Sequence, residues 1–548
     1  MSVKLIEPTQ SAYHYSLLIK QLLKPALIHS PGQEIIYRDK VRYDYTTLSK
    51  RIAQLANALG DLGVNQGDTV AVMDWDSHRY LECFFAVPMI GAVLHTINIR
   101  LSPEQLIYTI NHAEDDVIFV NSDFLPLLET VKDQLKTAKK IILLTDEDGP
   151  FDTVLNLDGE YEKILENCPC EYEFPDFDEN AMATCFYTTG TTGLPKGVFF
   201  SHRQIVLHTY GFMSGLCGYK THMTLDSGDV YMPMTPMFHV HAWGMPYLFT
   251  LLGNKQVYPG KYDPETLLKL VSKEKVTFSH CVPTIIHMLL NTPVIDKIDL
   301  SNWKIIIGGA ALSKGLCKAA MKHNINIYGA YGLSETCPLL TISNLKDHML
   351  DWDEDEQVRV RCRTGLPAPL VDLEVINVQG KPLPHDGKST GEVVVRSPWL
   401  TQGYLKSPEK SEALWENGWL HTGDIGFIDP EGYLQITDRL KDVIKTGGEW
   451  LSSLELEDII SQHPSVSEAA AIGVPDEKWG ERPMVFVILK KDFENKVSEQ
   501  DLKAFYGTFV EKGVIPKYGI PGEIQIVEEI AKTSVGKINK KELRKPYQ

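Results

Sequence analysis

The chain lacks a long apolar segment and any pattern of paired cysteines. The apolar run from Tyr15 to Leu23 is interrupted by Lys20 and Gln21, so we expect neither a signal peptide nor a membrane span. The nine cysteines are scattered, and only Cys168 and Cys170 are close together, which favours neither a disulfide framework nor a Cys-x-x-Cys metal site. A reduced, cytoplasmic setting is therefore expected.

Basic charge is also scarce. Lysine and arginine together number 54 against 72 aspartates and glutamates, which gives a formal charge of −18 over 548 residues. This balance does not favour a general electrostatic hold on nucleic acid or on an anionic membrane, so an anionic ligand must be bound by a local group of cations. The length indicates two or more domains, and a hydrophobic content of 43% is enough for a sizeable core.

A phosphate loop of the kinase and ATPase type is missing as well, although a related composition is present. Residues 187–198 are rich in glycine and threonine and carry one lysine, Lys196. Counted from Gly190, Pro195 stands where the second glycine of a Walker A loop belongs, and Gly197 stands where its serine or threonine belongs. Glycine N–H groups, threonine hydroxyls and an ammonium still suit a polyphosphate. The segment therefore predicts an ATP site with a different loop.

Helical and extended periodicities alternate through the first part of the chain. Apolar residues share one helix face over 48–59, and 81–90 and 103–110 are also predicted helices. Short apolar strands are predicted between and after them, at 69–73, 92–97, 117–120, 141–144 and 182–187. The alternation predicts a parallel sheet flanked by helices, with the threonine-rich loop at the carboxyl edge of that sheet. Short runs with glycine and proline turns predict a β-rich subdomain around 355–435.

Two further stretches carry residue types suited to a nucleotide. In 328–336, glycines allow close backbone approach, Tyr331 offers a flat face to a base, and Glu335 is a hard oxygen ligand suited to Mg²⁺. Asp424, in a His-Thr-Gly-Asp stretch, has two oxygens that can accept both ribose hydroxyls. Taken alone, each stretch also has a plain structural explanation, a helix cap at Ser334 and an ordinary turn.

The last two stretches are basic or charged. Residues 438–450 combine alternating charges with two glycines, a composition that an interdomain linker would also have. Near the end, Lys537 follows a glycine in a basic segment that could equally be a solvated tail. A positioned ammonium is needed wherever a carboxylate attacks the α-phosphate of ATP, because it offsets the charge that builds on the phosphoryl oxygens.

Taken in this order, the five stretches resemble the motifs of the adenylate-forming superfamily, which includes acyl- and aryl-CoA synthetases, adenylation domains and beetle luciferases. The resemblance implies an α/β fold with a large N-terminal domain of α/β layered subdomains plus a β-rich subdomain, over 1–437. It implies a small mobile α+β C-terminal domain over 438–548, with Asp438 as the hinge. It also implies ATP, Mg²⁺ and coenzyme A, a small carboxylic acid as substrate, and a homodimer that no residue pattern supports separately.

The same resemblance assigns roles to individual residues. The catalytic residues are expected to be Lys537, Glu335, Thr188 and His239. Thr188 and Glu335 are the expected Mg²⁺ ligands, with Thr191 as the alternative threonine. The expected ATP-binding residues are Thr188, Thr189, Gly190, Thr191, Thr192, Gly193, Lys196, Gly309, Gly329, Ala330, Tyr331, Gly332, Ser334, Glu335, Asp424, Ile436, Arg439, Lys441 and Lys537. The expected CoA-binding residues are Lys445, Gly447, Gly448, Glu449 and Trp450. The expected acyl-binding residues are His239, Trp243, Gly244, Met245, Gly308 and Gly332.

The identity of the acid rests on the stretch from Pro236 to Pro246, which is apolar and aromatic. Amino-acid-activating relatives place an acidic partner for the substrate ammonium where this chain has His239, so a free amino acid is disfavoured. Residues 236–243, together with residues 447–453, resemble medium- and long-chain fatty acyl-CoA synthetases, in which the counterpart of Trp243 gates an acyl tunnel. Trp243 and Met245 would also suit an ordinary core. Chain length stays open, as do alicyclic and aryl acids, because one methylene contributes only about 1 kcal/mol.

Other functions share parts of this pattern. A luciferase-like oxidoreductase would carry every motif and continue from the adenylate to oxidation. A non-catalytic acyl or nucleotide carrier would be expected to have lost Lys537 or Glu335, and both are present. A ligase that loads a carrier protein is a further alternative, and no fused carrier domain follows within these 548 residues. The favoured prediction is an AMP-forming acyl-CoA synthetase for an apolar acid.

Overall fold

The structure is a computed structural model that describes residues 3–188, 194–377, 379–439, 441–446, 449–493, 496–533 and 537–547. Several predicted site residues lie outside the described residues, namely Thr189, Gly190, Thr191, Thr192, Gly193, Gly447 and Gly448. The side chains of Glu449 and Trp450 are outside them too. No described helix is both long enough and apolar enough to cross a membrane.

A seven-stranded sheet carries the first predicted strands. Its order is β7 (Gly159–Glu160), β6 (Lys140–Leu144), β5 (Asp115–Asn121), β3 (Thr69–Met73), β4 (Val93–Thr96), β8 (Met182–Thr188) and β9 (Lys196–Ser201). All neighbours are parallel except β8 and β9, which form an antiparallel pair on either side of the threonine-rich loop. Strand β3 is buried along its whole length, as expected for the central strand of a covered parallel sheet.

Local signals explain where the flanking helices begin. Helix α4 (Pro103–Ala113) starts with proline in its first turn and a capping box between Ser102 and Gln105. Asp44 caps α2 (Tyr45–Asp61) by accepting a hydrogen bond from the Thr47 backbone. Helix α2 packs on α3 (His78–Met89) and α6 (Tyr161–Glu166), so its apolar face is buried. The helix and strand types predicted for this region are those observed.

A nine-stranded sheet lies beside the first and delivers several predicted site residues. Its order is β16 (Leu366–Pro367), β15 (Leu339–Ile342), β14 (Asn326–Gly332), β13 (Lys304–Ile307), β12 (Phe278–Cys281), β10 (Val230–Tyr231), β11 (Lys255–Tyr258), β1 (Glu34–Tyr37) and β2 (Val41–Asp44). The other helices of this half are α1 (Lys20–His29), α5 (Leu125–Glu129), α7 (His202–Cys217), α8 (Val240–Trp243), α9 (Met245–Leu252), α10 (Pro264–Glu274), α11 (Pro283–Leu290), α12 (Lys314–Met321) and α13 (Glu354–Arg361). The carboxyl ends of β13 and β14 lead to Gly308, Gly309 and Tyr331.

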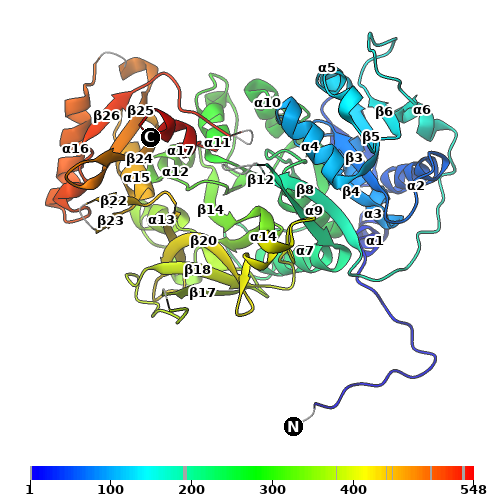
Figure 1. The fold of residues 1–548 in the computed structure, drawn as a ribbon, viewed down its shortest axis with the longest axis horizontal. Helices are drawn as coiled ribbons and strands as arrows, with labels where there is room; N and C mark the ends of the chain where they lie inside the picture. The colour runs from blue at the N-terminus through cyan, green and yellow to red at the C-terminus, as the bar shows by residue number, and fades with distance from the viewer. Residues whose placement is uncertain are drawn as a thin grey trace.

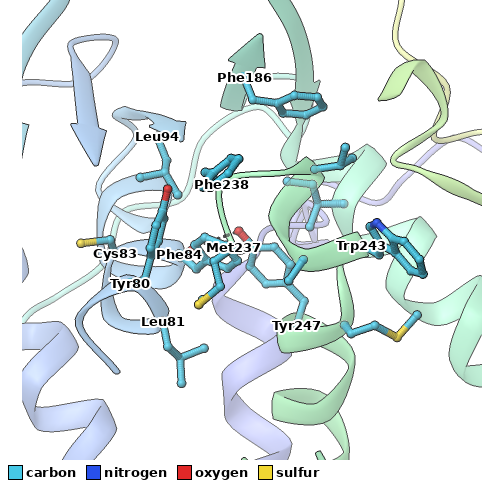
Figure 2. Close-up of a cluster of buried hydrophobic side chains, with 14 of the residues drawn as sticks. Tyr80, Leu81, Cys83, Phe84, Leu94, Phe186, Met237, Phe238, Trp243 and Tyr247 are labelled. Atoms are coloured by element: carbon cyan, nitrogen blue, oxygen red, sulfur yellow. Dashed lines mark hydrogen bonds between the residues drawn. The ribbon is translucent and has the colours of Figure 1, made fainter. Parts of the chain in front are cut away.

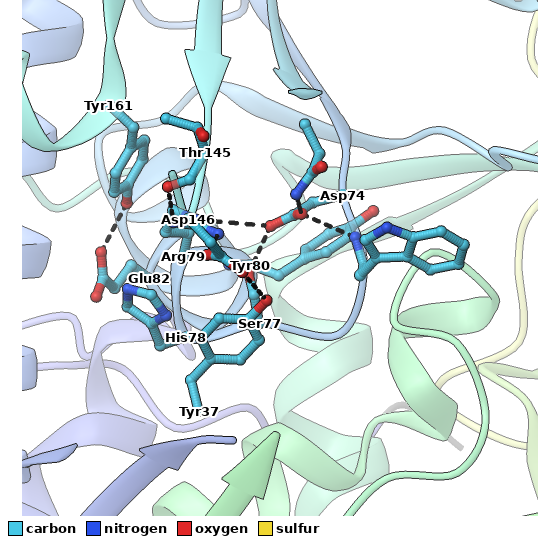
Figure 3. Close-up of polar contacts among 12 residues, drawn as sticks. Tyr37, Asp74, Ser77, His78, Arg79, Tyr80, Glu82, Thr145, Asp146 and Tyr161 are labelled. Atoms are coloured by element: carbon cyan, nitrogen blue, oxygen red, sulfur yellow. Dashed lines mark hydrogen bonds and ion pairs between the residues drawn. The ribbon is translucent and has the colours of Figure 1, made fainter. Parts of the chain in front are cut away.

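A buried polar network joins the two large sheets (Figure 3). Arg79, on α3, donates to Asp146 at 2.6 Å, and the Tyr37 hydroxyl donates to the other oxygen of Asp146 at 2.7 Å. The Ser77 hydroxyl donates to Asp74 at 2.5 Å. Tyr37 belongs to the nine-stranded sheet, whereas Asp74 and Asp146 follow strands of the seven-stranded sheet. Because Arg79 is buried, breaking its pair with the partly exposed Asp146 would leave a buried cation with less compensation, so this network resists relative movement of the two sheets.

The predicted β-rich subdomain is a five-stranded antiparallel sheet. It contains β17 (Asp372–Ile376), β18 (Gly391–Arg396), β20 (Trp419–Ile428), β19 (Trp415–Glu416) and β21 (Leu434–Arg439), with α14 (Pro408–Glu412) alongside. Strand β21 pairs with β20, so that Asp424 lies opposite Arg439 in the ladder. Two predicted nucleotide residues that are fifteen positions apart are thereby brought together.

The C-terminal elements form a separate body at one end of the molecule (Figure 1). Its sheet contains β23 (Glu449–Leu451), β22 (Ile444–Thr446), β25 (Gly480–Leu489), β24 (Val466–Asp476) and β26 (Glu523–Ile526), with helices α15 (Ser453–Ser461), α16 (Glu499–Glu511) and α17 (Lys540–Arg544). Two apolar clusters consist entirely of residues from 444 onward, so this body has its own core. The predicted α/β fold class, with a small α+β C-terminal domain, is confirmed. The predicted boundary at 437/438 falls within β21 and stays a prediction.

Candidate active site

A cavity of about 1890 Å³ lies between the large domain and the C-terminal body. Its walls come from the ends of β8, β13 and β14, from the β20–β21 pair and from the last loop of the chain. The predicted ATP-site residues that line it are Thr188, Lys196, Gly309, Gly329, Ala330, Tyr331, Gly332, Ser334, Glu335, Asp424, Ile436, Arg439, Lys441 and Lys537. His239 and Asp438 line it as well. Motifs that are far apart in the chain, from Thr188 to Lys537, therefore converge on one space.

Lys537 reaches this cavity from the C-terminal body. A Cβ placed on Gly309 would lie 2.8 Å from the Lys537 Cε and 3.4 Å from its Nζ. Gly309 has a φ of +76°, which residues with a side chain rarely adopt, so two independent constraints favour glycine there. Burial, and after it the charge of Arg439, lower the pKa of Lys537 to about 8, against the opposing effect of Asp424 and Glu335. The amine is thus mainly an ammonium at neutral pH.

Asp424 is buried beside a cation and a phenol. The Tyr331 hydroxyl donates to Asp424 Oδ2 at 2.7 Å, and Arg439 Nε lies 3.1 Å from Oδ1. Burial raises the pKa of Asp424, while Arg439 and Tyr331 oppose that rise. A carboxylate oxygen accepts two hydrogen bonds, so each oxygen keeps capacity for a further donor such as a ribose hydroxyl.

Glu335 lies half-buried in the turn after β14. Tyr404 Oη donates to Glu335 Oε1 at 2.8 Å, and the Lys196 Nζ lies 4.4 Å from the centroid of the Tyr404 ring. The sequence motifs gave no reason to select Tyr404, because it belongs to a loop between β18 and α14 and to none of the five stretches. A Cβ on Gly403 would lie 2.5 Å from the Ser411 Oγ, and Ser407 is the N-cap residue of α14, but neither feature points to the contacts of the Tyr404 side chain.

The residues present fit an Mg²⁺ ion that arrives with ATP. Within the described part of the chain, no group of three or more His, Cys, Asp or Glu side chains could hold a metal by itself. Mg²⁺ in nucleotide sites usually takes one or two carboxylates and completes its shell with phosphate oxygens and water. The Glu335 carboxylate and the Thr188 hydroxyl, both on the cavity wall, match that requirement.

His239 precedes α8, which is a single left-handed turn that ends in Trp243. From Val240 to Trp243 all four residues have positive φ, between 47° and 60°. Such left-handed geometry costs roughly 1–2 kcal/mol per residue for a residue with a side chain. Burial, followed by Lys537 and His241, lowers the pKa of His239 to about 3. His239 is therefore a neutral hydrogen-bonding group and cannot serve as a cation for the acid.

Two buried contacts fix the start of this turn. The Met237 backbone donates to Asp76 at 2.8 Å, and the Thr96 hydroxyl donates to the Phe238 carbonyl at 2.9 Å. Figure 2 shows Met237 and Phe238 within a packed apolar cluster that also contains Phe84, with Trp243 at its margin. Contacts with surrounding residues fix the conformation of this turn. Its residue types alone therefore do not predict left-handed geometry.

Most of the predicted acyl residues sit behind the cavity wall. Trp243 is 4% exposed and its ring packs on His280 at 4.8 Å between centroids. A Cβ on Gly308 would lie 2.9 Å from the Trp243 ring. Trp243, Gly244, Met245 and Gly308 are not among the described residues that line the cavity, unlike Gly332 and His239. Of the six predicted acyl residues, His239 and Gly332 are thus the two on the cavity wall.

Asp438, the predicted hinge, links the two bodies covalently and by hydrogen bonds. Its Oδ2 accepts from the Ser453 backbone and hydroxyl, both at 2.7 Å. Across the interface, Lys314 Nζ pairs with Asp458 at 2.7 Å, and His287 hydrogen-bonds Ser467 at 2.7 Å. These contacts hold the C-terminal body in the position that delivers Lys537.

The predicted CoA residues are only partly visible. Lys445 is an exposed residue of β22, and its backbone donates to Glu481 at 2.8 Å. It is not among the described residues that line the cavity. The CoA-binding role of these residues stays a prediction.

Comparison with known proteins places this arrangement in context. The model of the AMP-binding enzyme family matches residues 24–405, and the model of the AMP-binding enzyme C-terminal domain matches residues 455–537. A long-chain-fatty-acid–CoA ligase of Thermus thermophilus is 39% identical over 511 residues, covering 92% of this chain and 90% of that protein. A 3-methylmercaptopropionyl-CoA ligase of Ruegeria lacuscaerulensis is 36% identical over 543 residues, with 97% of both chains covered.

A medium-chain-fatty-acid–CoA ligase of Ectopseudomonas oleovorans is 34% identical over 543 residues, covering 97% of this chain and 96% of that protein. Among solved structures, an anthranilate CoA ligase in complex with anthranoyl-AMP superposes with a TM-score of 0.85 at 24% identity, covering 97% of both chains. At that identity the likeness establishes the fold alone.

Proposed function

We propose that this chain, which belongs to the AMP-binding enzyme family and is an AMP-forming acid–CoA ligase, activates an apolar carboxylic acid. The preferred substrate in this proposal is a medium- or long-chain fatty acid. The observation that carries the proposal is the convergence of Lys537, Asp424 and Glu335 on one cavity. Membership of the family implies that ATP binds there.

The first half-reaction joins the acid to AMP. A carboxylate oxygen attacks the α-phosphorus of ATP, the bond to the β-phosphate oxygen breaks, and acyl-AMP and pyrophosphate result. In our proposal the Lys537 ammonium stabilises the charge that develops on the α-phosphoryl oxygens. Asp424 holds the ribose hydroxyls, and Lys196 lies on the cavity wall as a counter-charge for the phosphates. Bound Mg²⁺, held by Glu335 and Thr188, would supply further neutralisation of phosphate charge.

The second half-reaction transfers the acyl group to CoA. The thiol sulfur bonds to the acyl carbon, its proton leaves to solvent, and AMP departs as the leaving group. We propose that the C-terminal body turns about Asp438 between the two steps, which would withdraw Lys537 from the cavity. The separate core of that body supports movement as a unit, and the few polar contacts across the interface support reversibility.

The apolar preference is supported by the residues that lie behind the cavity wall near His239. Trp243 and the cluster in Figure 2 are apolar or aromatic, and His239, on the wall itself, offers a neutral imidazole. A charged or amino-substituted acid would find no fixed partner among them. In our proposal the Trp243 indole is the gate between the cavity and this cluster.

The test is a panel of acids assayed for AMP release with and without CoA. We expect C6 to C18 straight-chain acids to release AMP and pyrophosphate, with CoA accelerating turnover. A preference for alicyclic, aryl or sulfur-containing short acids would replace the fatty-acid assignment but keep the reaction. Formation of ADP, or no ATP consumption with any acid, would refute the proposed function.

A further inference from the structure

Tyr404 is a buried aromatic residue on the cavity wall for which the motifs gave no role. Its segment is tied by the backbone to two of the candidate phosphate-binding elements. The Thr401 backbone donates to the Glu335 carbonyl at 2.9 Å, and the Leu405 backbone donates to the Gly197 carbonyl at 2.8 Å. Tyr404 itself forms a bridge with Val198 on β9. The segment therefore connects the strand that follows the threonine-rich loop with the turn that carries Glu335.

The side chain of Tyr404 contacts one group of each charge. Its hydroxyl donates to Glu335 Oε1 at 2.8 Å, and its ring lies 4.4 Å from the Lys196 ammonium. Tyr404 is only 7% exposed, and all three residues line the cavity. A carboxylate oxygen can only accept, so the phenol is the donor of this hydrogen bond.

The arrangement solves a problem that any site with a nearby lysine and glutamate faces. If the two groups paired with each other, the ammonium could not contact the phosphates and the carboxylate could not bind the metal. No Lys196–Glu335 ion pair occurs among the described residues, and the Tyr404 ring offers the ammonium a cation–π contact instead. The hydroxyl meanwhile leaves the second oxygen of Glu335, Oε2, without a bond from Tyr404.

We propose that Tyr404 is a positioning residue that keeps Glu335 and Lys196 apart and directs the first to Mg²⁺ and the second to the phosphates of ATP. This inference rests on the proposed function, because it takes MgATP as the ligand of the cavity. Hydrogen bonds to a metal-binding carboxylate typically change metal affinity by about 10- to 100-fold when they are removed.

The test separates binding from turnover. Mn²⁺ is titrated against the protein and a non-hydrolysable ATP analogue, with free Mn²⁺ followed by electron paramagnetic resonance. Tyr404→Phe keeps the ring but loses the hydroxyl, and it should weaken Mn²⁺ binding about tenfold. Nucleotide binding without metal should change little, since the contact of the ring with Lys196 is kept. Tyr404→Leu loses both contacts and should weaken nucleotide binding without metal as well.

Two comparisons guard against an indirect structural effect. Tyr433→Phe removes a buried hydroxyl that donates to the Asn344 carbonyl at 2.6 Å, outside the cavity lining, and should leave Mn²⁺ binding unchanged. In a Glu335→Gln background, adding Tyr404→Phe should cause no further loss of Mn²⁺ binding, because the partner of the hydroxyl has lost its charge. Thermal unfolding of each variant shows whether it is folded. If Tyr404→Leu does not fold, the Mn²⁺ binding of the near-isosteric Tyr404→Phe decides whether Tyr404 positions Glu335.

The outcomes distinguish this inference from the function on which it rests. Unchanged Mn²⁺ binding in Tyr404→Phe, or an equal loss in Tyr433→Phe, overturns the role of Tyr404. If the wild-type protein binds the metal and analogue but releases no AMP with any acid, the proposed function fails, while the titration still decides whether Tyr404 positions the metal ligand. Wild-type acid-dependent pyrophosphate exchange together with the tenfold loss supports both.

Discussion

Raising the pH above 8 should stop the first half-reaction by removing the proton of Lys537. The pKa of this lysine lies at about 8, below its ordinary value of 10.5, because the amine is buried and close to Arg439. The catalytically useful form is the ammonium, so activity should be full well below pH 8, about half at pH 8 and progressively lost above it. Each pH unit above the pKa lowers the charged fraction about tenfold, and about a tenth of the plateau should remain at pH 9.

The measurement is acid-dependent ATP–pyrophosphate exchange between pH 6.5 and 9.5. The kcat/KM for MgATP reports the free enzyme and should break near the pKa of about 8. The break in kcat should lie at higher pH, because bound phosphates stabilise the ammonium. Transfer of the acyl group from supplied acyl-AMP to CoA should show no break that depends on Lys537.

Two substitutions make this test specific. Lys537→Arg carries a charge throughout the range and should flatten the profile, whatever its absolute rate. Lys537→Ala should lower exchange roughly 10²- to 10³-fold, with acyl transfer from acyl-AMP nearly unaffected. The reasoning is refuted if the wild-type profile is flat, or if the arginine variant shows the same decline as the wild type.

Three further substitutions probe other parts of the site. Gly309→Ala should reduce pyrophosphate exchange about tenfold, because its Cβ would displace Lys537 and its backbone would be strained, and equal loss in acyl transfer would count against this explanation. Trp243→Ala should shift the acid panel toward longer or bulkier chains, and an unchanged profile would exclude the gate. Lys314→Ala should lower exchange roughly two- to fivefold by removing the pair with Asp458, without slowing acyl transfer, and a loss in transfer alone would contradict that role of the contact.

Residue patterns predicted the parallel sheet with its helices and the β-rich subdomain, whereas the resemblance to a family predicted the small C-terminal domain and the residues that line the cavity. Apolar periodicity predicted strand β3 and helix α4, and Glu335 was selected from a stretch whose glycines lie in β14. Lys537 was singled out because a basic tail with a glycine resembled a known motif. Its approach to Gly309 depends on how two separate cores dock, which local patterns do not encode.

Two features were beyond sequence reasoning for physical reasons. Tyr404 acts through contacts with Lys196 and Glu335, which lie 208 and 69 positions away in the chain, so no local pattern could select it. The left-handed turn from Val240 to Trp243 contains residue types that ordinarily avoid positive φ. Its geometry is imposed by the surrounding core, and context of this kind overrides intrinsic preference.

The position of Arg439 immediately after Asp438 has an electrostatic consequence for catalysis. Arg439 lies beside Asp424 only while β21 is paired with β20 up to its last residue. A pivot at Asp438 would pull the guanidinium away in the same movement that extracts the Lys537 ammonium. The pocket would then lack two positive charges. It would bind the AMP dianion more weakly at the stage when that product must depart.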